Sequence, residues 1–361
     1  MTGALLAATL EQLAALVAFD TRNPPRRIDG GGLLGYARTQ LEAAGCRCEL
    51  VDLGEGCVYL LALRGEPRIL FNVHIDTVPA DPAWQGDPLQ LRIEGERAIG
   101  LGACDIKGAL AAMLAALPGT HGPVALLLSS DEEAGSSRCV RAFLEQQKFA
   151  EVVVAEPTRC QAVLEHRGIG TATAVFSGVG GHASARRALN DSAVHAAVRW
   201  AALALAHAAR SEAEGEGLRL NIGAFEGGQK ANMIAASATL RLGVRPPPGL
   251  APQDALAQLF RLATDPARVN FVPGFLAPPL PAADASQLAQ ARMQGQALAS
   301  QLGVALGAAV DFWTEAALFS AAGATALVFG PGDIAQAHTA GEWVALAELA
   351  EAADVYRRMW S

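Results

Sequence analysis

The chain has 361 residues, of which 51% are hydrophobic and 18% are charged. This length corresponds to about two domains of ~100–200 residues each, and the apolar fraction excludes a globally disordered chain. The formal net charge is −8. Because nucleic-acid binding needs a clustered basic face, we expect no nucleic-acid partner and a small-molecule partner instead.

The sequence carries no sign of a membrane span or an export signal. The longest apolar runs, Ala109–Leu117 and Trp200–Ala206, are far shorter than the ~20 residues that cross a bilayer. The amino-terminal segment also lacks the basic stretch that opens a signal peptide. All six cysteines fall in the first half of the chain, which is typical of free thiols in a reducing compartment. Cys46 and Cys48 could bind a metal together, but no second pair follows at zinc-finger spacing. We therefore expect a cytoplasmic protein with no membrane partner.

Helices and strands alternate through the first part of the chain, to about residue 155. Apolar residues at helical spacing predict the helices, and short apolar runs predict the strands. The expected helices are Leu5–Phe19, Leu33–Ala44, Gly108–Leu117 and Ser137–Gln146; the expected strands are Cys48–Leu53, Val58–Arg64, Ile69–Ile75, Val124–Ser129 and Val152–Ala155. This order predicts an α/β domain whose parallel or mixed sheet has helices on both faces.

The pattern changes after Glu165 to the order β-α-β-β-α-β, which is typical of a two-layer α+β domain. Its expected elements are Thr171–Ser177, Asp191–Arg210, Leu218–Phe225, Ser237–Arg245, Pro252–Ala263 and Val269–Phe275. A proline-rich linker, Pro273–Pro281, follows. The alternation of helices and strands seen in the first part of the chain then resumes, with the expected elements Gln287–Leu302, Ala309–Phe312, Ala316–Ala322, Ala326–Val328 and Ala345–Met359. We expect residues 1–166 and 278–361 to form one domain, interrupted by an inserted domain of residues 167–277.

Acidic and histidine side chains recur where predicted strands end. In an open α/β sheet the carboxyl ends of the strands form the ligand-binding edge. The residues concerned are His74, Asp76, Asp105, Glu132, Glu133, Glu156 and His338. Each alone is more often an ordinary buried or exposed polar group. Their conjunction favours a metal site.

The residue types suit a site for two divalent ions. Carboxylate and imidazole ligands suit Zn²⁺, and Co²⁺ or Mn²⁺ can take its place. Two ions ~3.5–4 Å apart need a bridging carboxylate, and a further carboxylate must stay off the metals to move protons. A histidine ligand also needs an acceptor for its other ring nitrogen.

The order His-x-Asp, Gly-x-x-Asp-x-Lys-Gly, Glu-Glu, Glu-Pro and a distant histidine resembles the dinuclear zinc metallopeptidases. That family includes acetylornithine deacetylases, succinyl-diaminopimelate desuccinylases and aminoacylases. Segments 71–79, 230–234 and 330–338 look most similar to the branch that deacetylates N-acetylornithine, and more so to its N-acetyl-L-citrulline deacetylase relatives in arginine biosynthesis. The resemblance implies a zinc-exopeptidase-type catalytic domain, an inserted lid domain, and a homodimer formed through the lid.

The resemblance also implies a role for each metal-site residue. Asp105 would bridge two ions, either Zn²⁺ or Co²⁺. His74 and Glu156 would complete one site, and Glu133 and His338 the other. A cis peptide bond would follow Asp105.

The remaining roles also follow from the resemblance. Asp76 would orient His74, and Glu132 would be the general base. In the lid, His182 would stabilise the oxyanion, while Asn232 and Arg245 would hold the substrate. The segment Asp311–Glu315 is either pocket lining or core.

Alternatives remain open at this point. Within the enzyme class, the substrate could be succinyl-diaminopimelate, a dipeptide or another acylamino acid. A non-catalytic metal-binding scaffold would be expected to lack the general base, but Glu132 is present. A nucleotide-binding α/β protein is disfavoured because no Gly-x-Gly-x-x-Gly follows the first predicted strand and no P-loop is present.

Overall fold

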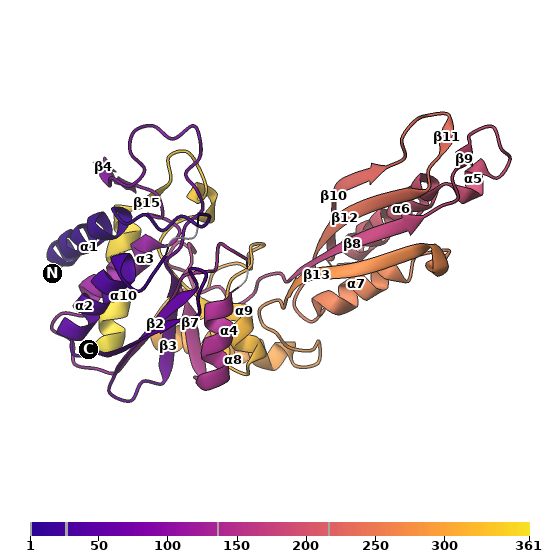
Figure 1. Ribbon diagram of the computed structural model, residues 1–361. Helices are drawn as coiled ribbons and strands as arrows, with labels where there is room; N and C mark the ends of the chain where they lie inside the picture. The colour runs from indigo at the N-terminus through magenta and orange to yellow at the C-terminus, as the bar shows by residue number, and fades with distance from the viewer. Residues whose placement is uncertain (1, 26–27, 136, 216) are drawn as a thin grey trace. The chain divides into compact units, whose positions relative to one another are not determined.

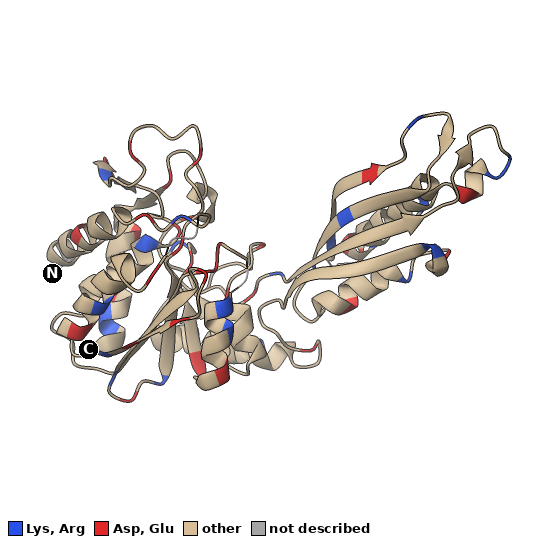
Figure 2. Cartoon of the chain, viewed as in Figure 1, with Lys and Arg blue, Asp and Glu red and all other residues tan. Residues whose placement is uncertain are grey.

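The computed structural model describes residues 2–25, 28–135, 137–215 and 217–361, which fold into two compact units. The larger unit comprises Met1–Leu164, Ala289–Ala309 and Thr314–Ser361. The smaller unit comprises Glu165–Leu288 and Val310–Trp313. None of the helices in the described residues is both long and apolar enough to cross a membrane. Figure 2 shows Lys and Arg dispersed over both units in this part of the chain.

The larger unit contains a six-stranded mixed sheet, as the sequence predicts (Figure 1). Its strands lie in the order β1 (Arg47–Asp52), β2 (Val58–Arg64), β6 (Val124–Ser129), β3 (Ile69–His74), β7 (Glu151–Val154) and β14 (Thr325–Val328). The four strands β6, β3, β7 and β14 run parallel, whereas β1 and β2 are antiparallel to their neighbours. The parallel strands are almost wholly buried, because helices cover both faces of the sheet.

One large hydrophobic core lies on the face covered by α3 (Lys107–Ala116). Every residue of α3 is buried, and its alanines let neighbouring helices pack closely against it. The helices of this core are α1 (Thr2–Val17), α2 (Gly32–Ala43), α3 (Lys107–Ala116), α8 (Leu288–Leu302) and α10 (Leu346–Trp360). On the other face, α4 (Arg138–Gln146) packs against α9 (Ala316–Ala321), with Phe143 beside Phe319.

Helix α10 packs against the sheet through aromatic side chains. Phe71 of β3 meets Tyr356 and Trp360 edge to face, with ring centroids 5.7 and 5.4 Å apart. Trp360 is 1% exposed although it is the penultimate residue. Aromatic residues of this kind contribute a large share of core stability.

The smaller unit is a four-stranded antiparallel sheet with two helices on one face. The strands lie in the order β10 (Arg219–Gly227), β12 (Ser237–Arg245), β8 (Ile169–Ser177) and β13 (Val269–Ala277). The helices α6 (Ala193–Ala213) and α7 (Pro252–Phe260) pack on it around a separate core. At one end of the unit, β9 (Gly181–His182) pairs with β11 (Met233–Ile234) beside the short α5 (Ala188–Asp191).

Several details differ from the sequence-based expectations. The chain returns to the larger unit later than residue 278, because Leu280 still pairs with His166 and residues 310–313 also belong to the smaller unit. Ala309–Phe312 is neither helix nor strand; Val310 makes only an isolated bridge to His166. The sequence analysis missed the three-residue strands β4 (Arg92–Glu94), β5 (Arg97–Ile99) and β15 (Trp343–Ala345), which are too short to show alternation.

We expect Trp360→Ala to lower the free energy of unfolding of the larger unit by about 3–5 kcal/mol, because it leaves a cavity beside Phe71 and Tyr356. Chemical denaturation followed by circular dichroism measures the change. Arg358→Ala, on the exposed side of the same helix, should stay within about 0.5 kcal/mol of wild type. An unchanged midpoint for Trp360→Ala would show that the C-terminal helix does not stabilise the core.

Candidate metal centre

Acidic and histidine residues follow parallel strands that end at one edge of the larger unit's sheet. Strand β3 ends at His74, and Asp76 follows two residues later. Strand β6 ends ahead of Glu133, and β7 ends ahead of Glu156. Because these neighbouring strands are parallel, their carboxyl ends lie together.

Asp105 and His338 reach the same edge from loops. Asp105 lies between β5 and α3, and the peptide bond that follows it is cis, as the resemblance implies. His338 follows the 3₁₀ turn Ile334–Gln336, which comes after β14. Its φ of 58° places it in the left-handed region, which is uncommon for residues other than glycine.

His74, Asp105 and Glu156 form the first of two ligand groups. Their ligand atoms all lie within 4.8 Å of one another, and all three residues are buried. His74 Nε2 is 3.1 Å from Asp105 Oδ1 and 3.8 Å from Glu156 Oε1. An imidazole and two carboxylates that converge in this way match the ligand chemistry of Zn²⁺.

Asp105, Glu133 and His338 form the second group, also within 4.8 Å. His338 Nε2 is 2.9 Å from Glu133 Oε1 and 3.4 Å from Asp105 Oδ2. Asp105 thus turns one oxygen toward His74 and the other toward His338. The five residues predicted as ligands come together in two groups that share one carboxylate.

The charges of the cluster fit a cation site. Among the described residues, the carboxylates of Asp105, Glu133 and Glu156 form ion pairs only with His74 and His338, not with lysine or arginine. Hydrogen bonds to Asp105 and Glu133 raise the pKa of His338 to about 10. Burial and the Asp105 carboxylate raise the pKa of Glu156. A metal ion bound by His338 would displace the proton that its imidazole otherwise holds.

Asp76 contacts His74, as expected, and also supports the neighbouring turn. His74 Nδ1 lies 3.0 Å from the Asp76 backbone oxygen, and the Asp76 carboxylate is farther away, at 3.5 Å. That carboxylate instead accepts the backbone N–H groups of Glu132 and Glu133 at 3.2 and 3.0 Å, and the side-chain amide of Asn23 at 3.0 Å. Asp76 thus orients the ring through its main chain and fixes the Glu132–Glu133 turn through its side chain.

Glu132 lies beside both groups but belongs to neither. Removal from water raises its pKa well above the ordinary value, although His74 acts in the opposite direction. The carboxylates of Glu133, Glu315 and Asp76 raise it further. A carboxyl group with a raised pKa that belongs to neither ligand group has the properties of a general base.

Sequence analysis left Glu315 between pocket lining and core, and it is buried in the larger unit. Glu315 is 1% exposed, and its Oε2 accepts the Ser129 hydroxyl at 2.9 Å. Burial raises its pKa to about 8, and the Asp131 carboxylate contributes. Its neighbour Asp311 belongs to the smaller unit and forms ion pairs with Arg167 and Arg219 at 3.0 and 2.7 Å.

The predicted lid residues lie at opposite ends of the smaller unit. His182 pairs with Met233 across β9 and β11, directly beside Asn232, whose backbone oxygen accepts the Ala183 N–H at 3.0 Å. Arg245 ends β12, whose nine residues span about 26 Å at ~3.3 Å per residue. One smaller unit therefore does not bring Arg245 together with His182 and Asn232.

The local contacts of His182 determine which ring nitrogen carries the proton. Nδ1 accepts the Ser184 backbone N–H at 3.3 Å and lies 2.8 Å from the Ser184 hydroxyl. A backbone N–H can only donate, so the proton of the neutral ring is on Nε2. The exposed imidazole thus presents a hydrogen-bond donor.

Arg245 is an exposed residue, and its guanidinium has no hydrogen-bond or ion-pair partner in the described part of the chain. Partial desolvation of the guanidinium lowers its pKa, and no neighbouring carboxylate among the described residues compensates. Such a guanidinium is available to an anionic ligand.

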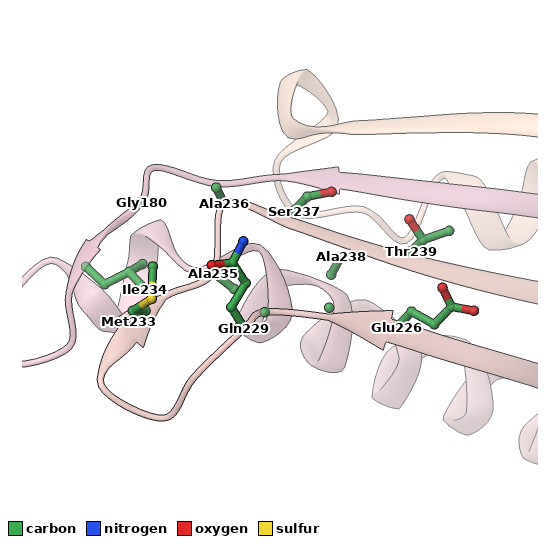
Figure 3. Close-up of a pocket in the computed structure, with 12 residues that line it drawn as sticks. Gly180, Glu226, Gln229, Met233, Ile234, Ala235, Ala236, Ser237, Ala238 and Thr239 are labelled. Carbon is green, nitrogen blue, oxygen red and sulfur yellow. The ribbon is translucent and has the colours of Figure 1, made fainter.

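The smaller unit also contains a hollow of about 380 Å³ near β9 and β11 (Figure 3). Its lining comes from Gly180, the end of β10, and residues 233–239. Glu226 is the charged residue among them. All of the lining belongs to the smaller unit, whereas both ligand groups belong to the larger one.

Comparison with known proteins agrees with this geometry. Residues 70–361 match the model of peptidase family M20/M25/M40. The chain is 51% identical to an N-acetyl-L-citrulline deacetylase of Xanthomonas campestris pv. campestris, covering 96% of this chain and 95% of that one. It is 32% identical to an acetylornithine deacetylase of Myxococcus xanthus, with the same coverage.

A solved structure shares the whole fold. The aminopeptidase PepT of Bacillus cereus superimposes with a TM-score of 0.78 over 98% of both chains, at 17% sequence identity. The family match covers most of the chain, and all five residues of the two ligand groups lie within the matched region. The chain is thus a metal-dependent hydrolase that belongs to peptidase family M20/M25/M40.

Proposed function

We propose that this enzyme removes the acetyl group from N-acetyl-L-citrulline, a step of arginine biosynthesis, in the cytoplasm. The observation that carries the proposal is 51% identity over 96% of the chain to a protein named for that reaction. The two ligand groups around Asp105 support the hydrolytic chemistry. Neither a nucleic-acid nor a membrane partner is needed for it.

The proposed cofactors are two divalent ions, Zn²⁺ or, in its place, Co²⁺. His74, Glu156 and one oxygen of Asp105 would hold one ion; Glu133, His338 and the other oxygen would hold the second. When bound, such ions polarise the amide carbonyl and lower the pKa of water.

Glu132 is the proposed general base. It takes a proton from the attacking water and passes it to the nitrogen of the leaving amine. Its raised pKa and its freedom from both ligand groups support this role. The Asp76 carboxylate accepts the backbone N–H of Glu132 and thereby fixes the main chain from which the Glu132 side chain extends.

His182 is the proposed oxyanion donor. Its Nε2–H faces away from the Ser184 contacts and is free to donate to the developing negative charge. Asn232, adjacent to it, is the proposed second polar contact to the substrate. Arg245 is the proposed partner of the substrate's α-carboxylate, since a guanidinium fork matches a carboxylate.

The separation of these lid residues supports a homodimer. The ~26 Å length of β12 exceeds the length of an acetylated amino acid, so one lid cannot use both of its ends on one substrate. We propose that His182 and Asn232 serve the active site of the partner subunit, whereas Arg245 serves its own.

N-acetyl-L-ornithine is the second candidate substrate, because the Myxococcus xanthus relative at 32% identity carries that name. We expect kcat/KM for N-acetyl-L-citrulline to exceed that for N-acetyl-L-ornithine in an amine-release assay with added Zn²⁺ or Co²⁺. Succinyl-diaminopimelate, a dipeptide and N-acetylmethionine complete the panel. A tenfold preference for N-acetyl-L-ornithine, which corresponds to about 1.4 kcal/mol, would reverse the assignment.

Glu132→Gln should lower kcat by about 10²–10⁴-fold and leave the metal content unchanged, because it removes a proton acceptor and no ligand. Glu133→Gln is the matched control: it makes the same change one residue away and should lose metal instead. Steady-state kinetics and elemental analysis of both variants test the pair. Turnover near wild type in Glu132→Gln would refute its role as base.

Arg245→Ala should lower kcat/KM by roughly 10²-fold, because a desolvated carboxylate loses its charge-assisted partner. Arg245→Lys should restore only part of the lost kcat/KM, since an ammonium group lacks the forked pair of donors of a guanidinium. Arg241→Ala, four residues earlier on the same exposed face of β12, is the control and should change little. If a substrate amide without the α-carboxylate is hydrolysed as well as the acid, Arg245 has a different role.

A further inference from the structure

Glu342 is a buried carboxylate that no step of the proposed reaction uses. It follows His338 by four residues, precedes β15, and is 2% exposed. In the described part of the chain it has no lysine or arginine ion-pair partner. A buried carboxylate is costly unless hydrogen bonds satisfy it.

Three backbone N–H groups of one loop satisfy this carboxylate. Glu342 Oε2 accepts the N–H of Gly102 at 2.8 Å, and Oε1 accepts those of Cys104 and Asp105 at 2.9 and 2.8 Å. The backbone oxygen of Glu342 also accepts the Gly100 N–H at 3.1 Å. A single residue therefore satisfies four amides of the loop that carries the shared ligand.

The loop and Glu342 are also joined through strand pairing. Strand β15 pairs antiparallel with β5, with Trp343 opposite Ile99. The loop that contains Asp105 continues directly from β5. The pairing of β15 with β5 therefore places Glu342 against the loop. The Glu342 side chain accepts hydrogen bonds from loop N–H groups that would otherwise lack a partner.

We propose that Glu342 is a positioning residue for the metal centre, which holds the Asp105 backbone so that its two carboxylate oxygens face the two ligand groups. The Asp105 amide is bound to Glu342 Oε1, while its Oδ1 and Oδ2 lie 3.1 and 3.4 Å from His74 and His338. A shift of the backbone would move both oxygens at once. The inference rests on the proposed role of Asp105 as a shared ligand.

The same short segment also carries a ligand of the second group. His338 and Glu342 are separated by three residues. The segment that supplies His338 therefore also hydrogen-bonds, through Glu342, to the loop that supplies Asp105. This arrangement fixes the spacing of His338 and Asp105 before any ion arrives. The second group, which contains the half-exposed His338, depends on it most.

Glu342→Gln tests the proposal with little change in volume. An amide oxygen can still accept from Cys104 and Asp105, as Oε1 does, but the amide nitrogen then faces the Gly102 N–H and cannot accept. We expect about tenfold weaker binding of Zn²⁺ to the metal-free protein by titration calorimetry. Glu342→Ala, which loses all three contacts, should weaken it by up to about 100-fold, as outer-shell changes at metal sites do.

Trp360→Ala is the control for a purely structural effect, because it destabilises the same unit without touching the loop. It should keep wild-type affinity for Zn²⁺. The visible spectrum of the Co²⁺-loaded protein gives a second readout: we expect it to change in Glu342→Gln and to remain that of wild type in Trp360→Ala.

The outcomes separate the two claims. If wild type binds two ions and Glu342→Gln binds both with unchanged affinity and spectrum, Glu342 is not a positioning residue and the proposed function stands. If wild type itself binds no divalent ion, the proposed function fails as well. If Trp360→Ala weakens binding as much as Glu342→Gln, the effect is one of stability, which also overturns the proposal.

Discussion

Asp105 faces two imidazoles at once, with Oδ1 directed to His74 and Oδ2 to His338. Each oxygen completes a different ligand group, so neither group exists without this residue. The rest of the larger unit can be understood as support for that arrangement. The parallel strands position His74 and Glu156. The Asp76 carboxylate accepts hydrogen bonds from the Glu132–Glu133 turn, and the Glu342 carboxylate accepts them from the loop that carries Asp105.

The support is mostly built from backbone amides. Asp76 and Glu342 are buried carboxylates that accept N–H groups from the segments that carry Glu133 and Asp105. Such contacts do not choose the metal or the substrate. They fix the ligand geometry in advance, which reduces the reorganisation that binding would otherwise require.

His74, Glu133 and Glu156 could be predicted because they lie at or just beyond the ends of predicted strands, whereas Asp105 and His338 lie in loops and were predicted from the motifs that resemble the family. Sequence reasoning did not find Glu342, whose partners lie 237–240 positions earlier, because no local pattern reports such a contact. For the same reason it did not predict that the Asp76 carboxylate also accepts the backbone N–H groups of Glu132 and Glu133. The separation of Arg245 from His182 could not be predicted from the sequence. It depends on the length of β12, which ends at Arg245, and on the pairing of β9 with β11 near the other end of β12. Metal identity, the lid's partner and the roles of the site residues remain predictions.

The central claim is that one carboxylate divides its oxygens between two cations. Anomalous diffraction from crystals of the Zn²⁺-loaded protein, collected at the zinc edge, tests it most directly. We expect two peaks ~3.5–4 Å apart, one beside His74 and Glu156, the other beside Glu133 and His338, with Asp105 between them. A single peak, or two peaks of which only one contacts Asp105, would contradict the account.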